Sequence, residues 1–331
     1  MYDTLHLRLH DPCVMAQALE SVVRVAGANH TAGAVLFHDV NGMPVYATRV
    51  RYNGGHIQIT SANGYCYLNV SLPRVKSNSG SNLIPVTKAE FPVMVQRLQD
   101  KLYEIGIVTS LREARVCRFD LFANAATRYT FQDFKPLFDT LYIPRRFRVV
   151  YAGSYTFRNT QREDQIYDKR AQMEDTGVDT TNVPAQCLRF ETRLLLSASV
   201  RTLGVHTVDD LERRWDVIEA WFVEHIKTVL RYSDDLPQTV ELGDVAAIVD
   251  HPQQAKTALF ARAVLAQVGG FDELRHLLKQ RRCHRKKIQR FVDKVVDGLL
   301  FPLADDRISL NELKRELCTL LLESLGVGGG R

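Results

Sequence analysis

Two short segments pair an arginine with a carboxylate two residues apart, in runs of residues that favour β-strands. They are Arg118-Phe119-Asp120 and Arg189-Phe190-Glu191. On a strand, side chains two apart point to the same face, so each segment should present its arginine with its acid while the phenylalanine turns into a core. The acids, Asp120 and Glu191, are therefore candidate ligands for a divalent metal. The arginines, Arg118 and Arg189, are candidate phosphate ligands.

A tyrosine and a lysine lie between these segments at Tyr167 and Lys169, and the spacing predicts that they share a face of a third strand. A phenol is a weak nucleophile at neutral pH because its pKa is about 10. A lysine on the same face would favour the phenolate and could hold a phosphate oxygen. Carboxylates such as Asp120 and Glu191 suit Mg²⁺ or Mn²⁺, which would polarise a scissile phosphate. The set predicts a tyrosine that attacks a phosphodiester.

Each motif alone has an ordinary structural explanation. An arginine and an acid at this spacing often form only a solvated surface pair, and Tyr167 could simply pack on an edge strand. The matched strands and the candidate nucleophile, on a chain of 331 residues with a formal net charge of +5, together favour the chemical interpretation.

Basic residues gather in two further places that we predict to contact DNA phosphates. One cluster contains Arg145 and Arg146, among aromatic residues. The other runs from position 281 to position 290 and includes Arg285, Lys286 and Lys287, with no acid in between.

The remaining composition predicts a cytoplasmic protein without a membrane partner. The six cysteines are scattered and form no Cys-x-x-Cys pair, which argues against a zinc site or a disulfide framework. Charged and polar residues interrupt the N-terminal segment, so a signal peptide is not expected. No apolar run approaches the roughly 20 residues that a membrane span requires.

We expect an α+β domain over 1–204, with an antiparallel-rich sheet and helices on one face. Alternating or β-branched runs predict strands at 1–9, 56–60, 65–71, 116–122, 147–157 and 188–195, and one around Tyr167. Helices are expected at 11–25, at 93–105 with Val93, Leu98, Leu102 and Ile105 buried, and from Thr130 to about position 141.

The region over 205–331 is expected to be all-α. Thr207 should cap a long helix whose buried stripe continues through Trp215 and Phe222. Further helices are predicted at 255–268, 271–278 and 284–299. This spacing is similar to a helix-turn-helix that lays its basic helix against DNA, or equally to a three-helix bundle with a solvated charged face.

The ordered set of motifs resembles the replication initiation proteins of filamentous bacteriophages. It consists of the opening strand Met1–Leu9, Arg118-Phe119-Asp120, Tyr167-Asp168-Lys169, and Arg189-Phe190-Glu191 followed by Leu203-Gly204. A similar Tyr-Asp-Lys followed by Arg-x-Glu occurs in plasmid rolling-circle initiators. The resemblance covers about residues 1–210, and the helical remainder more loosely.

That resemblance implies a rolling-circle endonuclease-like fold and a nickase that also recircularises its product. Tyr167 would become covalently attached to DNA, with Mg²⁺ or Mn²⁺ as cofactor. The implied partners are double-stranded and single-stranded DNA at a replication origin, a host helicase and a single-strand-binding protein, in the cytoplasm of a bacterial host.

The sequence departs from the wider superfamily in one respect, because its ten histidines form no His-x-His metal motif. Metal binding would then depend on carboxylates, with His56 or another acid completing the set. A tyrosine recombinase would need a His-x-x-Arg, which is absent. A non-catalytic DNA-binding regulator that uses the C-terminal helices is the alternative function.

Overall fold

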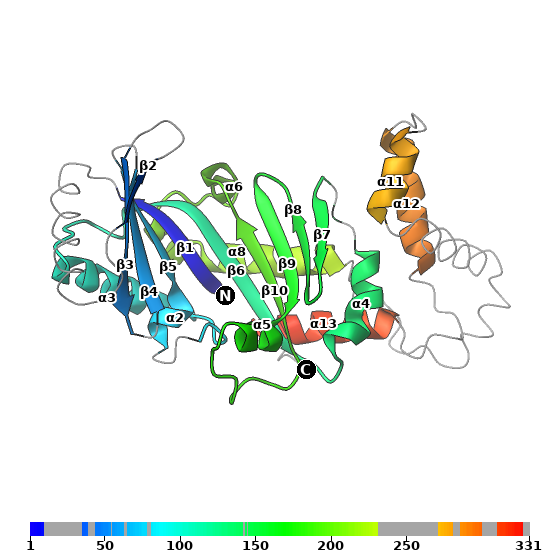
Figure 1. Ribbon diagram of the computed structural model, residues 1–331, viewed down its shortest axis with the longest axis horizontal. Helices are drawn as coiled ribbons and strands as arrows, with labels where there is room; N and C mark the ends of the chain where they lie inside the picture. The colour runs from blue at the N-terminus through cyan, green and yellow to red at the C-terminus, as the bar shows by residue number, and fades with distance from the viewer. Residues whose placement is uncertain are drawn as a thin grey trace. The chain divides into compact units, whose positions relative to one another are not determined.

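The computed structural model describes most of the chain (Figure 1). The chain divides into two compact units. Unit 1 contains 1–124 and 158–222, and unit 2 contains 125–157 and 223–331. The structure describes residues 1–9, 35–38, 44–53, 55–62, 65–77, 81–141, 143, 145–230, 271–280, 285–299 and 310–326. The predicted helices at 11–25 and 255–268 therefore lie outside the described residues, and the predicted boundary near position 204 stays a prediction.

Unit 1 is built on a large sheet with the strand order β2-β3-β4-β5-β1-β6-β10-β9. The strands are β1 (Tyr2–Leu9), β2 (Val35–His38), β3 (Pro44–Tyr52), β4 (Gly55–Ala62), β5 (Tyr65–Ser71), β6 (Arg115–Ala126), β9 (Arg162–Asp168) and β10 (Cys187–Leu194). The helices are α2 (Leu72–Lys76), α3 (Phe91–Glu104), α5 (Lys169–Asp175), α6 (Ser197–Arg201), α7 (Val208–Arg213) and the first part of α8 (Trp215–Leu230). The predicted α+β class with an antiparallel sheet is confirmed.

Alternation along β1 sets the two faces of this sheet. Leu5, Leu7 and Leu9 are buried, whereas His6 and Arg8 are only half-buried. β1 pairs antiparallel with β5 and β6. The strands predicted at 56–60 and 65–71 are present as β4 and β5, which pair antiparallel. Because opposed residues in a ladder share a face, one face of the sheet is apolar and the other is polar.

Aromatic side chains cover the apolar face. The ring of Trp215 lies edge-on to Tyr2 with centroids 4.7 Å apart, and Tyr2 also meets Phe119 at 5.7 Å. Further along, Phe190 packs against Phe222 with centroids 6.0 Å apart. Helix α8, drawn in yellow-green, therefore crosses behind β6 and β10 (Figure 1). Phe119 and Phe190 face the core as the sequence predicted, which leaves their neighbours at i±1 on the opposite face.

Several local predictions need correction. Val93 is half exposed, because the buried stripe of α3 runs through Phe91, Met94, Leu98 and Leu102 instead. Lys169 is not on a strand: the Asp168 side chain accepts a hydrogen bond from the Ala171 amide, which caps a new helix, α5, beginning at Lys169.

The long helix predicted after Thr207 is two helices. Thr207 does form a capping box with Asp210, but that box opens the short α7 (Val208–Arg213). The backbone of Arg214 leaves helical geometry, with φ −100° and ψ 15°, before α8 begins. Trp215 and Phe222 are nevertheless buried as expected.

Unit 2 contains neighbouring strands β7 (Phe147–Tyr151) and β8 (Ser154–Arg158) and helices α4 (Phe131–Thr140), α11 (Phe271–Gln280), α12 (Arg285–Leu299) and α13 (Leu310–Glu323). The single strand predicted at 147–157 is thus broken by a turn that includes Gly153, whose signal was missed. α4 begins at the Thr130 cap as predicted, and α11 and α12 match two predicted helices. α13 was not predicted, and an all-α C-terminal region remains a prediction.

None of the helices in the described part of the chain is long and apolar enough to span a membrane.

Candidate active site

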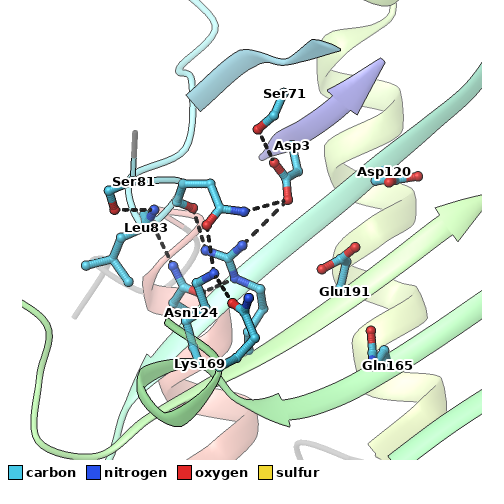
Figure 2. A network of polar contacts seen from close by, with 12 residues as sticks. Asp3, Ser71, Ser81, Leu83, Asp120, Asn124, Gln165, Lys169 and Glu191 are labelled. Atoms are coloured by element: carbon cyan, nitrogen blue, oxygen red, sulfur yellow. Dashed lines mark hydrogen bonds and ion pairs between the residues drawn. The ribbon is translucent and has the colours of Figure 1, made fainter. Parts of the chain in front are cut away.

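The polar face of unit 1 carries the candidate acids on adjacent strands. Asp120 on β6, Glu191 on β10 and Gln165 on β9 stand on the same side of the sheet (Figure 2). Glu191 is the ladder partner of Gln165, and Arg189 is the partner of Tyr167. The register therefore brings together Asp120, Glu191 and Tyr167, which lie far apart in the sequence.

Tyr167 and Glu191 are directly bonded. The Tyr167 hydroxyl donates to Oε2 of Glu191 at 3.0 Å, across a diagonal of the β9–β10 ladder. Both side chains are buried, with Tyr167 8% exposed. Burial raises the pKa of Tyr167 well above its ordinary value, and the charge of Glu191 adds to this effect. The resting phenol is therefore protonated, and Glu191 is the group placed to accept its proton.

Two arginines on the same face bind the two acids. Arg118 makes a bidentate pair with Asp120, with N–O distances of 2.8 and 2.6 Å. Arg193 donates from Nε to Oε1 of Glu191 at 2.6 Å, and the same nitrogen lies 4.0 Å from Oδ2 of Asp120. A second nitrogen of Arg193 donates to Glu163 at 2.7 Å. The guanidinium of Arg193 thus lies between the carboxylates predicted to bind metal.

These pairs set the charge of each acid. Burial raises the pKa of Asp120 to about 6, although Arg118 opposes the shift. Burial acts in the same direction on Glu191, but Arg193 and Arg189 outweigh it and hold its pKa below the usual value. Near neutral pH both acids are charged, and Asp120 is the one that protonates first on acidification.

Lys169 lies close to Tyr167 but is bonded to other groups. Its Nζ donates to Oδ1 of Asn82 and to Oε1 of Gln172, each at 2.7 Å, and lies 6.0 Å from the centre of the Tyr167 ring. Burial, reinforced by the charge of Arg189, lowers the pKa of Lys169 to about 7. The predicted stabilisation of the phenolate by Lys169 would therefore be an electrostatic effect from above the tyrosine ring, and not a hydrogen bond to the hydroxyl.

Arg189 is buried among polar groups that include Asp3 and Asn124, two residues labelled in Figure 2. It donates to Oδ1 of Asn124 at 2.8 Å and to the backbone carbonyl of Asn82, and it lies 3.6 Å from Oδ2 of Asp3. Its guanidinium also stacks 4.0 Å above the ring of Phe122. Because Arg189 is 0% exposed, it braces β10 against neighbouring segments. Phosphate binding by Arg189 stays a prediction.

The donor atoms around Asp120 and Glu191 fit a hard cation. They are the oxygen atoms of the two carboxylates and of the Gln165 amide. Glu163 lies two residues from Gln165 on β9 and is paired with Arg193. Mg²⁺ commonly uses one or two carboxylates and takes water or substrate phosphate for the remainder. Within the described residues, no group of three or more His, Cys, Asp or Glu side chains is placed to hold a metal. His56 is exposed on β4, which β5 and β1 separate from β6.

The polar face continues from the acids across the rest of the sheet. The ladders place Arg118, His6, Asn69, Gln58 and Arg49 opposite one another in turn from β6 to β3. Aromatic contacts connect this row to the residues beyond it on β1 and β5. His6 and Tyr67 form a ring pair with centroids 5.5 Å apart, and the guanidinium of Arg8 lies 4.5 Å from the centre of the Tyr65 ring. These are cationic and flat side chains of the kind that bind single-stranded nucleic acids.

The other predicted DNA-binding residues belong to unit 2. Arg145 is exposed and Arg146 half-buried, just before β7. Lys286 and Lys287 are exposed near the start of α12, at which Arg285 is the first residue. Positions 281–284 of the basic cluster lie outside the described residues.

Sequence reasoning missed Arg193, Gln165 and Glu163. A signal for Arg193 was present, since Arg189, Glu191 and Arg193 follow one another at the two-residue period of a strand. Gln165 and Glu163 share that period with Tyr167. Their relation to β10 depends on the register of the β9–β10 pair, which one strand alone does not define.

Comparison of this chain with protein-family models and with curated proteins finds no match.

Proposed function

We propose that this protein is a metal-dependent DNA nickase that cleaves and rejoins one strand at a replication origin to initiate rolling-circle replication of phage DNA. The observation that carries the proposal is the hydrogen bond between Tyr167 and Glu191, on a sheet face that also holds Asp120 and two arginines. A nucleophile, an adjacent proton acceptor and paired cations are what attack on a phosphodiester requires.

In the proposed reaction, Tyr167 Oη attacks phosphorus as its proton passes to Oε2 of Glu191, which already accepts the hydrogen bond at 3.0 Å. The phosphorus–oxygen bond to the 3′ side breaks, and the departing oxygen takes a proton from water. The product is a phosphotyrosine linked to the 5′ end and a free 3′ hydroxyl. Attack by a 3′ hydroxyl on this linkage reverses the step and rejoins DNA without another energy source.

Arg118 and Arg193 are the cations placed to bind the non-bridging oxygens of the reacting phosphate. Their side chains are 32% and 29% exposed, whereas those of Asp120 and Glu191 are 3% and 4% exposed. An arginine can bind phosphate through two parallel N–H groups. Asp120 and Glu191 would hold Mg²⁺ or Mn²⁺, and a bound cation would supply Lewis-acid stabilisation of the charge that develops on the phosphate.

The polar face also supports the proposal, because it carries side chains that could bind the DNA substrate. Tyr65 is 40% exposed beside Arg8, and the row from Arg118 to Arg49 leads away from Tyr167 across four further strands. Single-stranded DNA could follow this row with its phosphates on arginines and its bases on rings. The basic residues of α12 and those before β7 would bind further phosphates of the duplex.

The proposal is tested by incubating supercoiled plasmid that carries the phage's own intergenic region with the protein and Mg²⁺. We expect open-circular and relaxed closed-circular products with the wild-type chain, and neither product with Tyr167→Phe. A regulator that only binds DNA through its C-terminal helices would shift the plasmid in a gel and leave it supercoiled, and that result would replace the nickase proposal.

A further inference from the structure

The two acids of the candidate site each have a cationic partner on the same strand. Arg118 is bidentate to Asp120, and Arg193 binds Glu191 while its Nε lies 4.0 Å from Asp120. A divalent cation that used both carboxylates would have to approach the place where this guanidinium lies. With the arginines in their present positions the cation would also meet two like charges at short range, which is unfavourable in a partly buried site.

We propose that Arg118 and Arg193 are resident counter-ions that move from the carboxylates to the phosphate of bound DNA, so that DNA and divalent metal bind this site cooperatively. The inference rests on the proposed function, and in it the two arginines determine when the carboxylates can bind the metal. When a phosphate provides a new anionic partner, the guanidinium groups stay paired after they leave Asp120 and Glu191. The carboxylate oxygens that they release then become available to the metal.

The solvent exposure of the two arginines and the second ion pair of Arg193 would both allow such an exchange. The acids are almost fully covered, but roughly a third of each arginine side chain faces solvent, so the arginines can meet a phosphate without unfolding of the strand. Arg193 also has a second carboxylate partner, because its Nη1 lies 2.7 Å from Glu163. That ion pair can hold the arginine near the site after its bond to Glu191 is broken.

Charge balance explains why the coupling should be positive. In the free protein the positive charges of Arg118 and Arg193 neutralise Asp120 and Glu191. Metal alone would displace a guanidinium into water and leave two cationic groups near it. Metal together with a phosphodiester keeps every charge paired: the cation is on the two carboxylates, the guanidinium groups share the single negative charge of the phosphate, and Arg193 also retains its ion pair with Glu163. Coupling between two ligands is reciprocal, so metal should tighten DNA binding by the same factor.

The test measures Mn²⁺ binding directly, by the loss of the electron paramagnetic resonance signal of free Mn²⁺, for the full chain with and without oligothymidylate. Oligothymidylate alone is titrated as a blank. We expect weak binding by the free protein and binding at least about tenfold tighter with the oligonucleotide. For Arg193→Gln we expect tight binding without the oligonucleotide and little further gain when it is added.

Two control variants make the result specific. Arg193→Lys retains the positive charge and should keep binding weak in the free protein, which separates a charge effect from damage to the fold. Arg201→Gln removes an exposed arginine of α6 and should behave as wild type.

The inference is overturned if oligothymidylate leaves Mn²⁺ affinity unchanged, if Arg193→Gln binds no tighter than wild type, or if no form binds Mn²⁺. If the protein nicks the plasmid but shows no coupling between Mn²⁺ and oligothymidylate, the proposed function stands and the arginine exchange is wrong. Coupling without nicking would overturn the nickase and leave the exchange in place.

Discussion

The hydroxyl of Tyr167 lies 3.0 Å from Oε2 of Glu191, and the other oxygen of that carboxylate is held by Arg193 at 2.6 Å. One acid therefore connects the candidate nucleophile to a cation at the edge of the site. The arrangement assigns distinct tasks to neighbouring side chains, and each task can be removed separately.

Removing the charge of the acids should stop cleavage while leaving DNA binding. Asp120→Asn and Glu191→Gln preserve shape, and the glutamine can still accept the Tyr167 hydrogen bond. Each variant loses a negative metal ligand, and Glu191→Gln also loses the proton acceptor. We expect nicking rates to fall at least about a hundredfold, with origin affinity measured in the absence of metal nearly unchanged. Full activity of both variants, or of the wild type in EDTA, would contradict the metal assignment.

Lys169 should make the stability of the fold depend on pH. Burial lowers its folded pKa to about 7 from an ordinary value of 10.5, so between these values the unfolded chain binds a proton that the native chain does not. Above pH 10.5 the lysine is neutral in both states and its burial carries no charge penalty. As the pH falls from 10.5 to about 7, the unfolded chain takes up a proton that the native chain does not, so the free energy of unfolding decreases. Urea unfolding of Lys169→Met from pH 7 to pH 10 should therefore show a flatter rise in unfolding free energy than wild type. A parallel rise in both proteins would refute a buried, neutralised lysine.

Replacing the buried Arg189 should lower the free energy of unfolding much more than replacing an exposed arginine. Arg189→Met leaves Asp3 and Asn124 without their buried cationic partner, and removal of one member of a buried pair costs about 3–5 kcal/mol. The matched change Arg201→Met, on an exposed arginine, should stay within about 0.5 kcal/mol of wild type. Urea denaturation compares the two, and equal effects would show that the Arg189 network does not brace unit 1.

The basic start of α12 should bind phosphates of the duplex. Replacing Arg285, Lys286 and Lys287 by Ala should weaken binding to all duplexes alike. The slope of log affinity against log salt should become shallower by about 0.9 for each phosphate that the variant no longer neutralises.

A control of equal charge makes the duplex measurement specific. Lys88, Arg112 and Arg213 are exposed and already paired with carboxylates, so their triple Ala variant removes the same three charges elsewhere. Its salt slope should match wild type. Equal slopes in all three proteins would remove α12 from the interface.

The strands of the site were predictable because their chemistry follows a local period. Phe119 and Phe190 turn inward, and Asp120 and Glu191 turn to the other face, as a two-residue repeat requires. Lys169 was misplaced because Asp168 caps a helix, a competing local signal that the strand pattern obscured.

What the sequence could not provide is the partner of each charged group. Arg189 and Arg193 flank Glu191 at the same spacing, yet only Arg193 binds it, while Arg189 is drawn to Asp3 and Asn124. That choice depends on strand order and on segments brought in from far along the chain, since Asp3 belongs to β1 and Asn124 to β6.

The most direct measurement identifies the amino acid that becomes bound to DNA. Wild-type protein is incubated with Mg²⁺ and origin DNA labelled beside the scissile phosphate, then digested with nuclease and trypsin. Because trypsin cuts after Arg162 and Lys169, we predict the label on the peptide 163–169, linked to Tyr167. Tyr167→Phe should yield no labelled peptide, whereas Tyr151→Phe, on an exposed tyrosine, should label normally. Recovery of the label on any other peptide, or its persistence in Tyr167→Phe, would contradict the account.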